Sequence, residues 1–199
     1  MSGDSVSINL TNHFLIAMPG LVDVVFAKSV VYVCEHSDRG ALGLVINKPA
    51  SLSMADLFGK VSLPLLRHDL VDSPVYQGGP VQTERGFVLH EPLAEHTDDT
   101  VPGPYASTLS IPGGLEMTTS KDVLEELSVG SGPRKVIVSL GYAAWGQGQL
   151  EAELGDNAWL TVNADRAVIF DTPAQDRYDK ALALLGLQAW MISSEAGHA

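Results

Sequence analysis

Short apolar runs separated by turn-forming residues are the feature that most restricts how this chain can fold. Each run has the length of a β-strand and is rich in valine, isoleucine or leucine, and glycine, proline or aspartate commonly lies between runs. None approaches the roughly 20 apolar residues that a membrane-spanning helix requires. The pattern predicts strands at residues 14–18, 29–36, 41–46, 74–77, 86–90, 109–111, 115–118, 135–140, 158–162 and 167–170.

Helix signals are fewer and lie between these runs. Ser53 and Asp56 have the spacing of a capping box and predict a short helix. The clearest helix is the last one, with Thr172 as its N-cap and Gly186 at its end. The remaining expectations are a helix from residue 119 or 120 to residue 127, a loop or short irregular helix at 60–72, and an exposed connection at 97–103.

Together these elements predict a single-domain α+β fold. Many short strands with three to five helices argue against a regular alternation of strand and helix. With 199 residues, of which 45% are hydrophobic, the chain can bury a substantial core of its own. We therefore expect one domain over residues 1–199, in which residues 1–9 form a flexible N-terminal segment.

Cysteine use and the N-terminal residues indicate the cellular compartment. Cys34 is the only cysteine, so no internal disulfide can form, which suits a reducing environment. The residues before Leu10 are polar and acidic, and they lack the basic start and the apolar stretch of a secretory signal. The sequence therefore predicts a cytoplasmic protein that is not bound to a membrane.

The charge balance argues against direct nucleic-acid binding. The formal net charge is −12, from 24 acidic and 12 basic residues, and Arg134 with Lys135 is the one adjacent basic pair. Proteins gain affinity for DNA largely by neutralising phosphates with clustered lysine and arginine, whereas this surface should repel the nucleic-acid backbone.

A glycine-rich stretch follows the most apolar run and is similar in outline to a nucleotide cradle. It predicts a strand, then a turn over residues 141–148, then a helix, an order that can direct backbone N–H groups at a phosphate. The Walker pattern fails because Gln147 and Gly148 follow Gly146 where lysine and a hydroxyl residue are required. The dinucleotide pattern fails because Glu151 replaces its third glycine. Trp145, within the turn, is either an aromatic plug over the sheet or a platform on which a ligand stacks.

Two strand ends carry residues that could support chemistry. Residues two apart on a strand share a face, so Cys34 and His36 are expected to point the same way, and Glu35 the opposite way. A nearby imidazole would lower the pKa of the thiol and make it a nucleophile. If the strand ending at His90 lay alongside, a zinc set would be conceivable. The alternative is that Cys34 is a small core residue and that both histidines satisfy local hydrogen bonds.

A third motif, Gly78-Gly79-Pro80, lies between two predicted strands. Consecutive backbone N–H groups at such a turn can form a small nest for an anion. A tight turn without a ligand is the simpler interpretation, and the sequence leaves both open.

Five ordered motifs resemble the AlgH/YqgE family: FLIAMPGL (14–21), VVYVCEHSDRGALGLVINKP (30–49), GGPV with RGFVLHE (78–91), GYAAWGQGQLEAEL (141–154) and the terminal GHA. The resemblance implies a bacterial, cytoplasmic protein with an α+β fold whose bifurcated sheet curls into a pseudo-barrel. Members of this family are labelled transcriptional regulators, and the resemblance implies the same role here, although the label describes no mechanism. The motif positions expected to line a shared binding surface are Cys34, Glu35, His36, Asn47, Gly78, Gly79, His90, Trp145, Gly146 and Gln149.

These observations predict a non-catalytic regulatory or binding protein that acts through a protein or a small-molecule partner. They assign no catalytic residue, no metal ligands and no cofactor. The alternative is a thiol-dependent or metal-assisted enzyme centred on Cys34, His36 and His90.

Overall fold

The computed structural model describes residues 8–93 and 104–192, which form ten β-strands, five α-helices and three short 3-10 helices. The strands are β1 (His13–Ala17), β2 (Val30–Ser37), β3 (Gly40–Val45), β4 (Pro49–Ser53), β5 (Pro74–Gln77), β6 (Val81–His90), β7 (Thr108–Ile111), β8 (Leu115–Thr118), β9 (Val136–Trp145) and β10 (Trp159–Asn163). The helices are α1 (Met54–Lys60), η1 (His68–Leu70), α2 (Asp122–Ser128), α3 (Gln149–Gly155), α4 (Arg166–Phe170), η2 (Ala174–Asp176), α5 (Arg177–Ala183) and η3 (Ala189–Met191).

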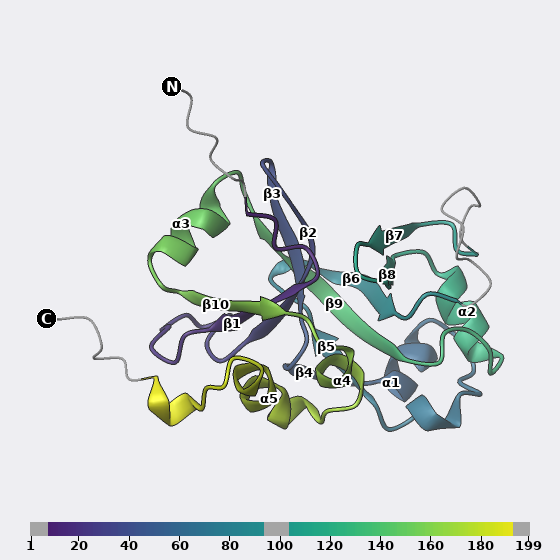
Figure 1. Ribbon diagram of the computed structural model, residues 1–199. Coiled ribbons are helices and arrows are strands. Elements are labelled where there is room, and N and C mark those ends of the chain that lie inside the picture. The colour runs from purple at the N-terminus through teal and green to yellow at the C-terminus, as the bar shows by residue number, and fades with distance from the viewer. Residues whose placement is uncertain (1–7, 94–103, 193–199) are drawn as a thin grey trace, which may run out of the picture.

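Strand β9 is the centre of the fold (Figure 1). The sheet has the order β10-β1-β2-β3-β9-β6-β8-β7, with β5 also pairing with β9 and β4 with β5. The last residues of β9 pair antiparallel with β3, whereas Ser139 and Leu140 pair in parallel with β5. The sheet therefore divides at β9 and curls into a half-barrel, which confirms the predicted α+β fold with a bifurcated sheet.

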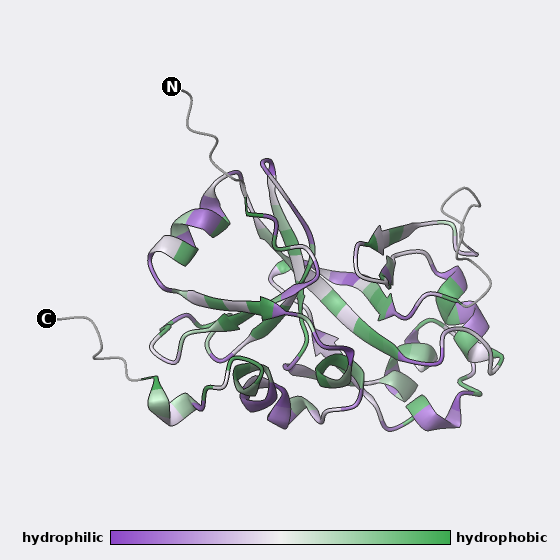
Figure 2. Cartoon of the chain, viewed as in Figure 1, coloured by the Kyte–Doolittle hydropathy of each residue, from purple (hydrophilic) through white to green (hydrophobic). Residues whose placement is uncertain are grey.

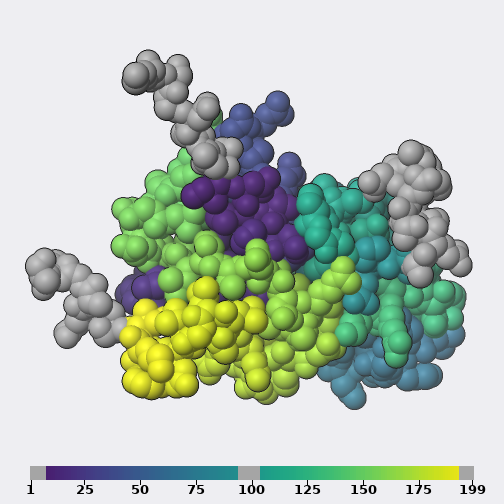
Figure 3. All heavy atoms as spheres, in the orientation of Figure 1, coloured from purple at the N-terminus to yellow at the C-terminus, as the bar shows by residue number. Residues whose placement is uncertain are grey.

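Three apolar clusters fill the two faces of this sheet. The first lies between the strands and helices α4 and α5, the second lies under α3, and the third packs beneath α1 and α2. Figure 2 shows that the central strands carry mostly apolar residues, whereas the tip of the β2–β3 hairpin is hydrophilic. In Figure 3 the C-terminal part of the chain, in yellow and light green, covers one side of the molecule. Phe14 and Ile16 of β1 lie in the same buried cluster as Ala181 and Leu182 of α5, so the two ends of the described chain complete a common core.

Two backbone features decide where functional side chains lie. The first is a β-bulge in β2 between Val33 and Glu35, where the pairing with β3 slips by one residue. The second is a close crossing of the β5–β6 connection over β9. A Cβ atom on Gly79 would lie 2.1 Å from the carbonyl carbon of Tyr142, and one on Gly141 would lie 2.4 Å from the oxygen of Gly79. Glycine is required on both sides because the two backbones are in contact.

Most predicted elements are confirmed, and the capping box of α1 is present, with the Ser53 hydroxyl accepting the N–H of Asp56 at 3.1 Å. The predicted strand at residues 167–170 is wrong, because this apolar run forms helix α4, whose N–H groups are capped by Asp165. Thr172 is not the cap of the last helix, since its hydroxyl donates to the carbonyl of Ala167. The α-helix begins later, at Arg177. The expected connection at 97–103, and the flexible segment at 1–9 except for residues 8 and 9, lie outside the described residues.

Candidate functional site

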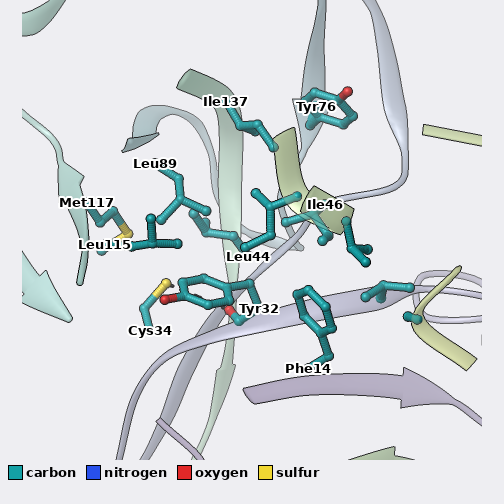
Figure 4. Packing of buried hydrophobic residues seen from close by; sticks show 14 of the residues in the cluster. Phe14, Tyr32, Cys34, Leu44, Ile46, Tyr76, Leu89, Leu115, Met117 and Ile137 are labelled. Atoms are coloured by element: carbon teal, nitrogen blue, oxygen red, sulfur yellow. Dashed lines mark hydrogen bonds between the residues drawn. The ribbon is translucent and has the colours of Figure 1, made fainter. Parts of the chain in front are cut away.

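Cys34 lies in the core. Its side chain is 1% exposed and packs in the first apolar cluster, where the sulfur lies among Tyr32, Leu115 and Met117 (Figure 4). Burial, reinforced by the charge of Glu35, raises the pKa of the thiol far above its usual range. The thiol therefore remains protonated and uncharged at neutral pH, the opposite of what a nucleophile requires.

His36 has partners on the other side of the sheet. Its Nδ1 accepts the N–H of Leu10 at 2.9 Å, and its Nε2 lies 2.8 Å from Oε1 of Glu151. Because Nδ1 is an acceptor, the proton of the neutral ring is on Nε2, which donates to Glu151. The expectation that Cys34 and His36 share a face is wrong, since the bulge between them reverses the alternation of side chains. Glu35 points to solvent.

His90 is also fully enclosed. Its Nδ1 donates to the carbonyl of Glu91 at 2.8 Å, and its Nε2 accepts the hydroxyl of Thr118 at 2.8 Å. Burial lowers the pKa of His90 and keeps the ring neutral. Among residues 8–93 and 104–192, no three His, Cys, Asp or Glu side chains gather in a way that could hold a metal ion.

The glycine-rich stretch around Trp145 is tied together by its own side chains. Trp145 is the last residue of β9, not part of a turn, and it is buried. Its indole N–H and that of Trp159 both donate to Oε2 of Glu153, at 2.9 and 2.8 Å. The N–H of Gly146 donates to Oε1 of Gln149 at 3.0 Å. This geometry agrees with an aromatic plug, and the donor that a phosphate could have used is already taken.

Gly78 and Gly79 form the close crossing over β9. The N–H of Gly78 donates to the carbonyl of Leu140 at 2.9 Å, so that donor is not free to bind an anion. Nearby, the Asn47 side chain accepts the N–H of Val30 and donates to the carbonyl of Lys28, both at 2.8 Å. Asn47, which follows β3, therefore ties the end of that strand to Lys28 and Val30, where β2 begins.

A pocket lies beside this crossing and has a volume of about 530 Å³. Its wall is mostly apolar, with one cationic side chain and few neutral polar ones. It is lined by Val24, Val25, Val45, Lys48, Ala50, Gln77, Gly79, Pro80, Thr83 and Leu140. Of the ten predicted surface residues, Gly79 alone lines it. Asn47 lines a neighbouring pocket of about 380 Å³ that shares Lys48 with the first.

The loop between β1 and β2 borders the pocket and presents apolar side chains to solvent. Val22 and Val24 are 99% and 101% exposed. The loop is nevertheless held in place, because Oδ1 of Asp23 accepts the N–H groups of Val25 and Phe26 at 2.8 and 2.9 Å. The Phe26 ring packs on both tryptophans, with centroid distances of 6.1 and 5.6 Å. Val22, Val24 and Val25 are thus exposed together on a loop that its own hydrogen bonds hold in place beside the pocket.

Lys48 supplies the positive charge of the pocket. Its ammonium donates to the carbonyl of Val25, and partial burial lowers the pKa of Lys48 against the opposing effect of the Asp23 carboxylate. A carbonyl is a weaker partner for an ammonium than a carboxylate or phosphate. Lys48 can therefore gain by contacting an anionic group in the pocket.

The sequence interpretation missed most of these pocket residues, although two signals were present. The segment LVDVVF at 21–26 is apolar but belongs to no predicted strand. Lys48 is a single cationic residue that follows an apolar run. Thr83 and Gln77 line the same pocket because the β5–β6 connection crosses β9, and no local sequence pattern indicates that crossing.

Comparison with known proteins identifies a matching family model and close relatives of the chain. A family model described as AlgH-like matches residues 14–190. A UPF0301 protein of Polaromonas sp. (strain JS666 / ATCC BAA-500) is 70% identical over 199 residues, and one of Variovorax paradoxus (strain S110) is 67% identical over 199 residues. Each alignment covers 100% of both chains.

Two solved structures resemble the fold. The solution structure of the AlgH protein from Pseudomonas aeruginosa is 46% identical, with a TM-score of 0.74 and coverage of 100% of both chains. The crystal structure of a protein from Corynebacterium diphtheriae is 19% identical, with a TM-score of 0.67, and the match covers 87% of this chain and 85% of the other. This second likeness concerns the fold alone. None of the helices in the described ranges is long and apolar enough to cross a membrane.

Proposed function

The chain belongs to the AlgH-like family, and from that premise we propose that it is a non-catalytic binding protein whose regulatory effect depends on a small ligand held beside Lys48. Membership of the family confirms the resemblance drawn from the five sequence motifs. The observation that carries the proposal is the apolar pocket of about 530 Å³ with a single lysine in its wall. Ligand sites in proteins commonly have volumes of about 300 to 1,000 Å³ and are mostly apolar with few polar groups.

The chemistry of the wall indicates the class of ligand. Val24, Val25 and Leu140 favour an aliphatic or otherwise apolar body, and the Lys48 ammonium favours one carboxylate or phosphate on it. The exposed side chains of Gln77 and Thr83, which also line the pocket, can form hydrogen bonds with the same polar end. A small amphipathic anion is the ligand that uses all of these groups.

The three residues of the enzyme alternative have structural partners instead. Cys34 is a protonated core thiol, His36 holds Leu10 and Glu151, and His90 is enclosed by Glu91 and Thr118. We expect Cys34 in the native protein to react with a disulfide reagent such as 5,5′-dithiobis(2-nitrobenzoate) at least about ten times more slowly than in the urea-unfolded chain. Equal rates would restore the enzyme alternative.

Binding of octanoate, measured by calorimetry and by amide NMR shifts, tests the proposed function. We expect saturable binding, with the largest shifts at Ala50 and Gly79, and weaker binding of the uncharged analogue octanol. Lys48→Gln should weaken octanoate binding about tenfold and leave octanol binding unchanged. Lys60→Gln, at the exposed end of α1, removes the same charge and should change neither.

A pocket-filling variant provides an independent control. Ala50→Trp should abolish binding of both octanoate and octanol while the protein stays folded, because the indole occupies the pocket volume. If neither ligand binds at millimolar concentration, or if binding is the same in the Lys48 and Ala50 variants as in the wild type, the pocket is not the ligand site.

A further inference from the structure

Arg177 is a buried cation at the start of helix α5. Its side chain is enclosed, with the residue 5% exposed. Its Nε donates to the carbonyl of Thr172 at 2.9 Å, its Nη1 donates to the carbonyl of Ile46, and its guanidinium carbon lies 4.9 Å from the centre of the Tyr76 ring. Across residues 8–93 and 104–192, no carboxylate lies within ion-pair distance of it. Two backbone dipoles and one aromatic face thus surround a full positive charge.

This arrangement leaves binding capacity on the guanidinium. The group remains charged and has five N–H donors, of which the two carbonyls engage two and the Tyr76 side chain engages another. Burial opposes the charged form and lowers the pKa of Arg177. A buried charge is ordinarily stabilised by an opposite charge or by a full set of hydrogen bonds. The remaining donors would therefore gain charge-assisted hydrogen bonds from an anion.

A small cavity adjoins the guanidinium. It has a volume of about 100 Å³ and is largely enclosed by residues from α1, β5, β9, α4 and α5. Arg177, Tyr76 and Ser73 contribute polar side chains to its wall, and polar atoms make up more of the exposed wall than apolar atoms do. This volume exceeds what a single water needs.

We propose that this cavity binds a small monovalent anion, no larger than acetate, which the Arg177 guanidinium holds by charge-assisted hydrogen bonds. The volume admits a halide or a short carboxylate and excludes a bulky anion. Arg177 contacts Ile46 and Tyr76, which belong to distant parts of the chain, so a bound anion would stabilise the junction between the C-terminal helices and the sheet. The site shares no lining residue with the octanoate pocket, so the two proposals stand or fall separately.

Anion-dependent stability and bromide diffraction test the site. The melting temperature is measured in sodium chloride, sodium acetate and sodium gluconate at equal ionic strength, since gluconate is too large for the cavity. We expect a higher melting temperature in chloride or acetate than in gluconate, rising with anion concentration. The preferred anion distinguishes a halide site from a carboxylate site. Equal melting temperatures in all three salts would overturn the proposal.

Two variants and one control locate the effect. Arg177→Met should lose the difference between chloride or acetate and gluconate, whereas Arg39→Met, at the exposed β2–β3 turn, should retain it. Should Arg177→Met not fold, Ser73→Leu keeps the arginine and fills the cavity, and it should lose the same difference while remaining folded. Persistence of the anion effect in the folded variant would place binding elsewhere.

Crystals soaked in sodium bromide give a direct readout. We expect an anomalous peak within hydrogen-bond reach of the Arg177 guanidinium. Water alone in the cavity, or a carboxylate of residues 94–103 or 193–199 against the guanidinium, would refute the site.

Discussion

At the scale of single residues, Ser139 stands out among the buried polar side chains. Its hydroxyl is inaccessible to solvent and is the one buried side-chain polar atom in the described residues without a hydrogen-bond partner. The Gly78 backbone crosses close to Ser139, since a Cβ atom on Gly78 would lie 2.9 Å from the Cβ of Ser139. The space at position 139 therefore suits a small side chain. The hydroxyl itself contributes nothing that offsets its loss of hydration.

Ser139→Ala should therefore stabilise the protein by about 1 kcal/mol, since the substitution removes an unpaired hydroxyl without creating a large void. Urea unfolding followed by circular dichroism measures the change in free energy. The matched control is Ser128→Ala, because the buried Ser128 hydroxyl donates to the carbonyl of Glu125 at 2.6 Å. That variant should be destabilised by about 1 kcal/mol. Destabilisation of both variants alike would show that Ser139 has a partner.

His90 makes stability depend on pH. Burial lowers the pKa of His90 in the folded protein below its ordinary value of about 6.5, so the unfolded chain binds the proton more tightly. Stability from this residue is complete above that ordinary pKa and is lost as the pH falls toward the folded pKa. Between pH 7.5 and pH 5 the loss can reach about 2 kcal/mol, a limit set by the roughly 1.5 pH units that separate the ordinary pKa from pH 5.

His90→Gln should reduce the difference in unfolding free energy between pH 7.5 and pH 5, because glutamine has no proton to gain. His68→Gln, at an exposed position, should leave the difference as it is in the wild type. The measurement is denaturant unfolding of the three proteins at both pH values. A difference that His90→Gln does not alter would assign the pH dependence to other groups.

At the scale of elements, the crossing of the β5–β6 connection over β9 is the contact on which the pocket depends. Gly79→Ala should destabilise the fold by about 3 kcal/mol or more, because its Cβ would overlap the backbone of Tyr142 and its φ of 155° disfavours a side chain. Gly59→Ala, in α1, has no neighbour within 4 Å of the new Cβ and should be neutral or stabilising by up to about 1 kcal/mol. Thermal unfolding of the two variants compares them. Equal stability would mean that the crossing relaxes at little cost.

Local patterns predicted most elements of this fold but not the contacts between them. Short apolar runs and the Ser53 capping box located strands and α1 because those signals lie within a few residues of one another. Residues 167–170 were misassigned because β-branched residues suit a strand, although Asp165 was positioned to cap a helix. The bulge at Cys34 could not be predicted, since it arises from pairing with β3, and it separated the thiol from His36.

Local sequence patterns predicted the candidate site less well than they predicted the fold. The motif positions identified residues that hold the fold, such as Trp145 on Glu153, more often than residues that line the pocket. Lys48, Gln77 and Thr83 come together only because the chain crosses itself at Gly79, and no spacing in the sequence encodes that crossing.

At the scale of the whole molecule, the net charge of −12 and the pairing of its cations argue that any regulatory effect does not involve direct contact with DNA. The one adjacent basic pair is weakened as a phosphate site, because Lys135 contacts Asp171 at 2.9 Å. Arg67 is likewise paired with Asp69 at 2.7 Å, and Arg177 is buried.

We expect no mobility shift of a 30-base-pair duplex at micromolar protein in about 50 mM salt, where attraction to phosphate is strong. Asp171→Asn frees Lys135 and should still give no shift, because one lysine neutralises about one phosphate. A shift that weakens steeply as salt is raised would contradict this expectation, because such a dependence arises from phosphate neutralisation by a basic surface.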